Sequence, residues 1–158
     1  MARGNVKIRR SPIAPDQKYD SLVLSKFINY IMLNGKKTVA EKIVYDALTL
    51  TAEKLKLEPM DAFNQVLKNV APILEVKSKR IGGANYQVPV EVGKDRKNTL
   101  AMRWIIESAK SAKGKPMCVK LSQEMINAYN GEGTSIKKKH DTHKMAEANK
   151  AFAHFARF

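Results

Sequence analysis

The sequence VKSKRIGGANYQVPVEV, at residues 76–92, differs in its period from the rest of the chain. From Tyr86 to Val92, large apolar residues occupy every second position, which predicts a β-strand. The run from Val76 to Ile81 predicts its partner strand, and Gly82-Gly83 supplies the tight turn between them. Because Pro89 has no N–H group to donate, we expect it at a sheet edge. The sequence therefore predicts a β-hairpin at about residues 75–92.

The segment before this hairpin carries the spacing of three and four residues that is typical of amphipathic helices. One helix is predicted to begin after Asp20 or Ser21 and to stop at Asn34-Gly35, and another to run from Pro59 to about Ala71. A helix between these two is predicted to turn one apolar face inward, made of Val39, Ile43, Ala47 and Leu50.

Three more helices are predicted after the hairpin. The first runs from about Lys97 to Ala112, and the second follows the break at Gly114-Lys115-Pro116. The last starts near Thr134 or Ser135, with an apolar face made of Met145, Ala148, Phe152 and Phe155. The predicted fold class is mainly α: a single helical bundle of about six helices, with one protruding β-hairpin and a basic N-terminal arm.

Length and composition limit the possible classes of protein. The 158 residues suit one domain, and 44% hydrophobic with 28% charged residues is a globular composition. The sequence contains no run of 18 apolar residues, so no transmembrane helix is predicted. The first ten residues lack the apolar core of a secretory signal. We expect an arm over residues 1–15, where Pro12 and Pro15 disfavour a helix, and one domain over residues 16–158.

The net charge of +14 predicts a polyanionic partner. The excess is clustered: residues 1–15 carry +4, residues 75–98 carry +3 and residues 134–158 carry +4, whereas residues 16–74 carry only +1. Clustering of this kind is typical of a protein that binds nucleic acid. A solvated basic surface and an anionic membrane are the alternative explanations.

Three local features are candidate nucleic-acid contacts. The hairpin offers Lys77, Lys79, Arg80, Gly82 and Gly83. The helix after it offers a stripe spaced by seven residues, and the turn beyond extends it: Arg96, Arg103, Lys110, Lys113 and Lys115. The start of the last helix offers Lys137, Lys138, Lys139, His143 and Lys144. Each feature has an ordinary alternative, which is a hairpin turn with solvated lysines, a solvated helix face or a solvated tail.

Catalytic and metal-binding patterns are missing from the sequence. The GxSxG, HExxH, GxGxxG and GxxxxGK[ST] motifs do not occur. His140 and His143 are three residues apart, but His154 lies about 16 Å further along a helix axis, and the one cysteine, Cys118, is expected in the core. We therefore expect no enzyme, no cofactor and no metal site.

Two long motifs closely resemble those of the universal small-subunit ribosomal protein seven family, bacterial type. One is GGANYQVPVEV at residues 82–92, and the other is THKMAEANKAFAHF at residues 142–155. Near the start, KFIN at residues 26–29 is followed by GKK at residues 35–37, which matches as well. The resemblance extends over nearly the whole chain.

The resemblance implies a structural RNA-binding protein of translation in the cytoplasm, without enzymatic activity or a membrane partner. Family members bind the 3′ major domain of small-subunit ribosomal RNA, nucleate assembly of the head, and lie near the tRNA exit site and the mRNA exit path. They contact the eleventh small-subunit protein and other head proteins. Because the arm and the basic helical faces also bind RNA in this family, the resemblance adds candidate contacts at Arg3, Lys7, Arg9, Arg10, Lys36 and Lys37.

The chain departs from the family pattern at two places. The usual arginine pair before the turn is Lys79-Arg80 here, and the segment before the last motif is Lys138-Lys139-His140. Lysine offers a point charge without the bidentate fork of arginine, so individual contacts are expected to be looser. Two rival functions remain open at this point: a DNA-binding architectural protein, and a helical interaction module that uses an edge made of Phe152, Phe155 and Phe158.

Overall fold

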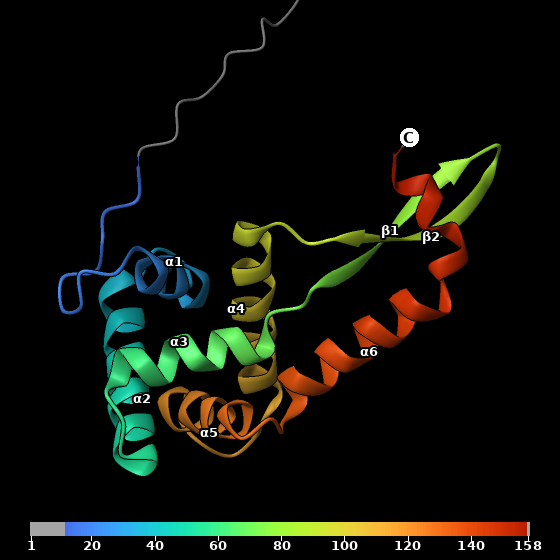
Figure 1. Cartoon of the computed structure of the whole chain (residues 1–158). Helices are drawn as coiled ribbons and strands as arrows, with labels where there is room; N and C mark the ends of the chain where they lie inside the picture. The colour runs from blue at the N-terminus through green and yellow to red at the C-terminus, as the bar shows by residue number, and fades with distance from the viewer. Residues whose placement is uncertain (1–11, 158) are drawn as a thin grey trace, which may run out of the picture.

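The computed structural model describes residues 12–157, except for the side chain of Arg157. Its elements, in chain order, are α1 Leu22–Ile31, α2 Lys37–Leu55, α3 Pro59–Val70, β1 Leu74–Ile81, β2 Ala84–Glu91, α4 Lys94–Ser111, α5 Met117–Tyr129, α6 Thr134–Ala148 and the 3₁₀ helix η1 Lys150–Arg157. Helices α1 to α5 form a bundle, from which the hairpin and α6 extend to one side (Figure 1). The predicted fold class is confirmed.

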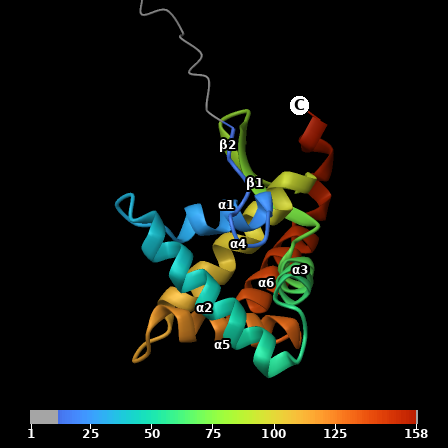
Figure 2. The same cartoon turned by 90° about the vertical axis from the view of Figure 1, so that its left-hand side faces the viewer.

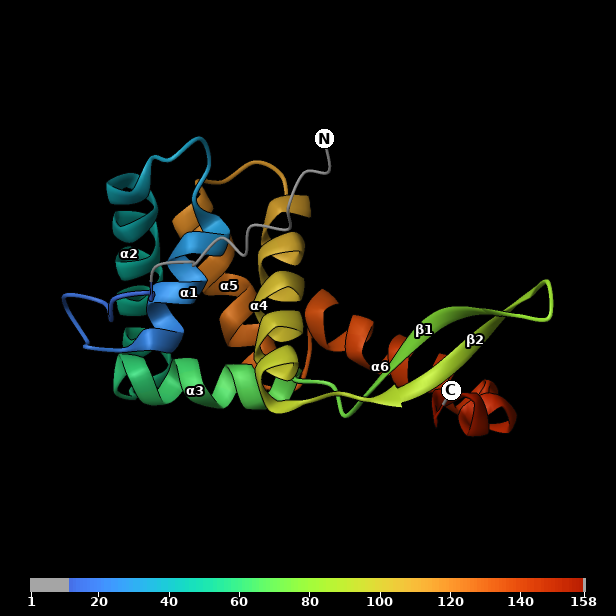
Figure 3. The same ribbon diagram turned by 90° about the horizontal axis from the view of Figure 1, so that it is seen from above.

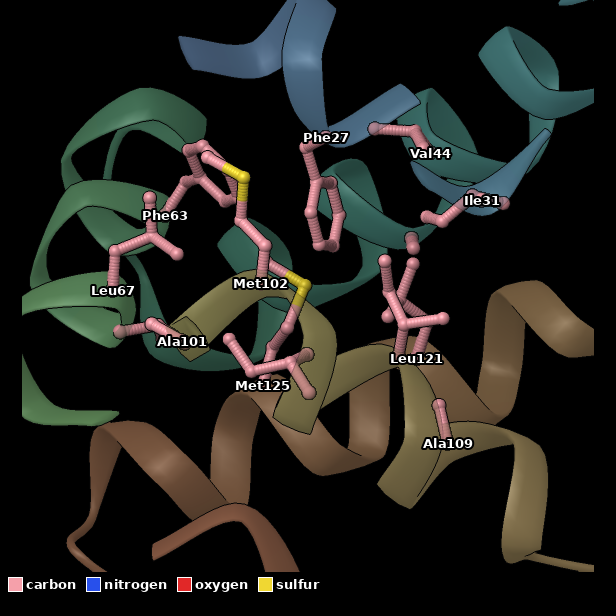
Figure 4. Close-up of a cluster of buried hydrophobic side chains, with 14 of the residues drawn as sticks. Phe27, Ile31, Val44, Phe63, Leu67, Ala101, Met102, Ala109, Leu121 and Met125 are labelled. Atoms are coloured by element: carbon pink, nitrogen blue, oxygen red, sulfur yellow. The ribbon is translucent and has the colours of Figure 1, made fainter. Parts of the chain in front are cut away.

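The hydrophobic core lies where α1 to α5 meet. Phe27 of α1 and Phe63 of α3 are fully buried, and their ring centres are 5.2 Å apart. Met102 of α4, with Leu121 and Met125 of α5, closes the cluster from the other side (Figure 4). Each of these side chains stabilises the fold by roughly 1.5–3 kcal/mol through burial. The buried residues of this cluster all belong to helices, and none of them comes from the hairpin.

The inward face of α2 differs from the predicted one. Val39 is 54% exposed, and the buried residues are Ala40, Val44, Ala47, Leu48 and Thr51. The predicted stripe was one position out of register, except at Ala47. Because α2 packs against α1, α3 and α5, the face that those contacts cover turns inward, and small alanines allow the helices to approach closely. The hydrophobicity of Val39 therefore predicted a buried position for a side chain that is exposed.

The predicted β-hairpin is confirmed. Ile81 of β1 lies opposite Ala84 of β2, which leaves Gly82 and Gly83 as a two-residue turn. Their φ values are +57° and +89°, a conformation that glycine adopts without steric cost. Pro89 lies opposite Val76 in a two-stranded sheet, where each strand is an edge. The strands project well beyond the bundle (Figure 3).

The apolar face predicted for the last helix is wrong in its first half. Helix α6 ends at Ala148, and Met145 is 53% exposed. The buried residues of α6 are instead Ser135, Ile136 and Ala146. Because the chain changes to a 3₁₀ helix after Asn149, the side chains beyond that point no longer continue the stripe of α6.

The N-terminus of α6 is capped by a side chain from another helix. Its N-cap residue, Gly133, has no side chain to offer. The carboxylate of Glu124 in α5 accepts hydrogen bonds from the Ser135 backbone N–H at 2.9 Å, from the Ser135 hydroxyl at 2.6 Å and from the Thr134 hydroxyl at 3.4 Å. This buried carboxylate fixes the direction in which α6 leaves the bundle.

Candidate nucleic-acid interface

The chain is anchored to the bundle at Asp16. Its carboxylate accepts hydrogen bonds from the backbone N–H groups of Lys18 at 3.1 Å and Tyr19 at 3.0 Å, and from the Tyr45 hydroxyl at 2.6 Å. Burial, followed by the Asp16 hydrogen bond, raises the pKa of Tyr45 above its ordinary value. Asp16 therefore fixes where the predicted arm would join the domain. The candidate residues of the arm, Arg3, Lys7, Arg9 and Arg10, lie outside the described residues.

The start of α2 presents two exposed lysines, Lys36 and Lys37. They follow a turn at Asn34 and Gly35, whose φ values are +52° and +73°. Lys37 lies 3.9 Å from Glu41 of the next turn, as its i, i+4 spacing predicts. Positive charge at a helix N-terminus opposes the helix dipole, and an external anion would offset that cost.

Helix α4 carries its candidate residues on one exposed side. Arg96, Arg103 and Lys110 are all exposed, as predicted. The Arg96 Nε atom lies 3.2 Å from the buried Glu75 carboxylate at the base of β1, and Lys77 lies 3.2 Å from the other oxygen of the same group. Two cations on one carboxylate leave a positive charge uncompensated at the base of the hairpin.

The remaining cations of this set, Arg103, Lys110, Lys113 and Lys115, have no ion-pair partner within residues 12–157. The Arg103 guanidinium lies 5.5 Å from the centre of the Tyr30 ring, which holds it over α1 by a cation–π contact. Lys110, and Lys113 and Lys115 in the turn beyond α4, are exposed. These charges are available to an external anion.

The basic cluster on α6 is divided between two roles. Lys137 and Lys144 are exposed. Lys138 pairs with Glu107 of α4, and the Lys139 Nζ atom donates to the Asn69 carbonyl of α3 at 2.6 Å. The structure thus uses two of the predicted lysines to hold α6 against the bundle. No local pattern in the sequence indicates these contacts, because each joins positions about thirty or more residues apart.

His143 joins α6 to the base of the hairpin. Its Nε2 atom accepts a hydrogen bond from the Ile73 backbone N–H at 3.0 Å. Burial lowers the pKa of His143 below its ordinary value, and the nearby charges of Lys139 and His140 lower it further. Only the neutral ring can accept this bond, and the lowered pKa favours that form.

The remaining candidate residues, near the tip of the hairpin, differ in their surroundings. Arg80, Gly82 and Gly83 are exposed. The Lys79 Nζ atom is turned toward η1, where it donates to the carbonyl oxygens of Phe155 at 3.2 Å and Ala156 at 3.4 Å. Viewed from the side, the hairpin stands above the bundle close to the end of the chain (Figure 2).

Basic groups therefore lie over α2, α4, α6 and the hairpin, and they do not converge on one point. Within residues 12–157, no three His, Cys, Asp or Glu side chains gather closely enough to hold a metal ion. Among the same residues, no helix has both the length and the apolar character needed to span a bilayer. An extended set of separate cations suits a polymer of phosphates better than a small ligand.

Comparisons with known proteins give a consistent result. The family model described as "Ribosomal protein S7p/S5e" matches residues 2–150. A protein of Chloroflexus aurantiacus named small ribosomal subunit protein uS7 is 56% identical over 155 residues, which cover 98% of each chain. The protein of the same name from Thermosipho melanesiensis is 53% identical, over 98% of this chain and 99% of its own length. The one from Nitrosococcus oceani is also 53% identical, over 94% of this chain and 95% of its own length.

Proposed function

Because the chain belongs to the ribosomal protein S7p/S5e family, we propose that it is a structural RNA-binding component of the small ribosomal subunit, acting in translation in the cytoplasm. The observation that carries this proposal is identity above one half over almost the full length of both proteins. Membership of a structural ribosomal family also agrees with the prediction that the chain is not an enzyme.

The finer proposal concerns the RNA that is bound. The chain binds the 3′ major domain of small-subunit ribosomal RNA and nucleates assembly of the head, near the tRNA exit site and the mRNA exit path. The eleventh small-subunit protein and other head proteins are its protein neighbours. This proposal is supported by the exposed basic residues on α2, α4, α6 and the hairpin, which lie outside the buried core.

Binding proceeds through phosphate neutralisation. Each lysine or arginine that contacts a phosphate releases condensed counterions, so affinity falls as the salt concentration rises. Each contact makes the slope of log binding constant against log salt concentration more negative by roughly 0.7–0.9. The contacts that Arg96 and Arg103 make with Glu75 and Tyr30 reduce the freedom of their side chains before RNA arrives. Less conformational entropy is then lost on binding.

The test is a salt titration of binding between the full chain and a transcript of the 3′ major domain. The double variant Lys113→Gln and Lys115→Gln is compared with the double variant Lys42→Gln and Lys54→Gln, which removes the same charge from exposed positions on α2 outside the candidate set. We expect the first pair to lower the slope by about 1.4–1.8, and the second to leave it unchanged. Equal effects of the two pairs would contradict the assigned surface.

A competition experiment with the same transcript tests the first rival function, and contacts within the chain bear on the second. If duplex DNA competes with the transcript at equal phosphate concentration, the chain is a general polyanion binder and the ribosomal proposal fails. The interaction-module alternative needs a free aromatic edge made of Phe152, Phe155 and Phe158, of which Phe158 lies outside the described residues. Phe152 and Phe155 instead lie against Tyr86 of the same chain, at ring-centre distances of 5.2 and 5.3 Å, so their rings are engaged within the molecule.

A further inference from the structure

The turn between α1 and α2 carries the dipeptide Asn34-Gly35 on the outside of the molecule. Both residues are exposed, and the turn projects from the bundle (Figure 2). Asn34 has a φ of +52°, a left-handed conformation that asparagine enters more readily than most other residues. A Cβ atom placed on Gly35 would meet no atom within 4 Å, so the space around this part of the backbone is open.

The backbone nitrogen of Gly35 has no hydrogen-bond acceptor. The bonds that close the turn come from its neighbours: the Lys36 N–H donates to the Leu33 carbonyl at 3.1 Å, and the Lys37 N–H donates to the Gly35 carbonyl at 2.8 Å. In the part of the chain that the structure describes, neither the Gly35 N–H nor the Asn34 side chain makes a hydrogen bond. No bond has to break before this nitrogen can react.

The charges around the turn favour a reaction at this nitrogen. Lys36 and Lys37 follow it directly and are both exposed. Positive charges nearby stabilise a negative charge, so they favour loss of the Gly35 amide proton and the oxyanion that forms when the nitrogen attacks a carbonyl group.

A second Asn-Gly pair in the same chain is held in a different way. At Asn130-Gly131, the Gly131 N–H donates to the Ala128 carbonyl at 3.3 Å, and the next N–H, that of Glu132, donates to the Asn127 carbonyl at 2.8 Å. Both residues of this pair are exposed as well. The two pairs therefore share their sequence and exposure, but only in the first is the glycine nitrogen without a bond in the described part of the chain.

We propose that Asn34 is a site of spontaneous deamidation, at which the chain gains a carboxylate and an isoaspartyl linkage in the turn before α2. The Gly35 nitrogen gives its proton to water and attacks the Cγ carbonyl of Asn34. A new C–N bond forms, the bond from Cγ to the side-chain nitrogen breaks, and that nitrogen takes up a proton and leaves as ammonia.

The resulting five-membered succinimide ring is opened by one water molecule. Breaking the bond from Cγ to the Gly35 nitrogen gives aspartate at position 34, whereas breaking the bond from the main-chain carbonyl carbon to the same nitrogen gives isoaspartate. One water is consumed and one ammonia is released, and the reaction needs no oxidant or reductant.

The isoaspartyl product changes the turn. Its main chain passes through the former side chain, which adds one atom between Leu33 and Gly35. This atom enlarges the ring that the hydrogen bond from Lys36 to Leu33 closes. We therefore expect that bond to weaken, and Lys36 and Lys37 to shift relative to the rest of α2.

The test compares the two Asn-Gly pairs within one molecule. The full chain is held at physiological pH and temperature and digested with trypsin at intervals, which puts Asn34 in the peptide of residues 27–36 and Asn130 in that of residues 121–137. Deamidation raises the mass of a peptide by about one dalton. We expect Asn34 to react about three- to tenfold faster than Asn130, because attack at the second site must first break the Gly131 hydrogen bond.

Unfolding in urea is the control for sequence. Because both asparagines precede glycine, their rates in the unfolded chain should agree within about twofold. Asn34→Gln should abolish most of the mass gain in its own peptide, since glutamine needs a six-membered ring, and should leave Asn130 unchanged. Asn130→Gln should leave the rate at Asn34 unchanged.

A second readout detects the isoaspartyl product itself. A protein-isoaspartate carboxyl methyltransferase with labelled S-adenosylmethionine should transfer methyl groups to aged wild-type chain and few to aged Asn34→Gln. Amide exchange at Lys36 should also quicken on ageing in the wild-type chain.

Equal rates at the two sites of the folded chain, or a faster rate at Asn130, would overturn the assignment of Asn34. A mass gain at Asn34 without methyl acceptance would overturn the isoaspartyl product. Neither result depends on RNA, so the proposed function stands or falls separately.

Discussion

Replacing Glu124 by alanine is expected to be the most damaging single change outside the hydrophobic core. The carboxylate accepts two short hydrogen bonds from Ser135, a residue with no exposed surface, and a longer one from Thr134. Hydrogen bonds to a charged group are worth roughly 1.5–3 kcal/mol each, and a negative charge at a helix N-terminus adds about 0.3–1 kcal/mol. Because such contributions overlap, we expect Glu124→Ala to lower the free energy of unfolding by about 3–4 kcal/mol.

The assay is chemical denaturation followed by circular dichroism, with thermal melting as a second measure. For a chain of this size, a loss of about 3 kcal/mol corresponds to a fall in Tm of about 6–12 °C. Glu132→Ala is the matched control, because Glu132 is exposed and lies just before Gly133, and its side chain makes no hydrogen bond or ion pair in the described part of the chain. Glu124→Gln keeps the shape without the charge and should fall between the two. If Glu124→Ala and Glu132→Ala agree within about 1 kcal/mol, the cap contributes little and the reasoning is refuted.

Three further predictions follow from other contacts. Tyr45→Phe removes the hydroxyl that binds the Asp16 carboxylate, and it should lower the free energy of unfolding by about 1–2 kcal/mol in urea denaturation, since the site is partly exposed. Because the pKa of His143 is lowered in the folded state, stability should be constant above the ordinary pKa of 6.5 and fall as the pH drops below it, until the folded-state pKa is passed. In His143→Gln, unfolding measured at a series of pH values should lack this pH-dependent component. In the wild-type chain alone, protection of the Ile73 amide, measured against its intrinsic exchange rate at each pH, should fall at low pH. Gly83→Ala meets no neighbouring atom within 4 Å, so its cost should come only from the φ of +89°, about 1–2 kcal/mol, seen as faster amide exchange across the hairpin.

The local features of the fold could be predicted from the sequence because they depend on neighbouring residues. The two glycines, the alternation after Tyr86 and the proline at the start of α3 each encode a backbone conformation. The N-cap of α1 follows the same logic: Ser21 accepts the Leu24 N–H, as an N-cap serine should. The resemblance of two motifs then supplied the family, which the comparisons confirm.

The features that escaped prediction all depend on contacts between distant parts of the chain. Nothing near Val39 indicates that α2 is rotated, because its neighbours α1, α3 and α5 decide which side is covered. The candidate site shows the same limit. Lys138 and Lys139 read as free positive charge in the sequence, yet they hold α6 to α4 and α3. A count of charges thus located the basic surface but could not tell a structural lysine from an available one.

The contact between η1 and the hairpin also has a consequence for synthesis. Lys79 and Phe155 are 76 positions apart, so the hairpin is translated long before the segment that covers it. At about 5–20 residues per second, roughly 4–15 seconds pass between the two. During that interval the Tyr86 side of the nascent hairpin is bare, and the growing polypeptide presents an aromatic ring and a lysine that the finished molecule keeps covered.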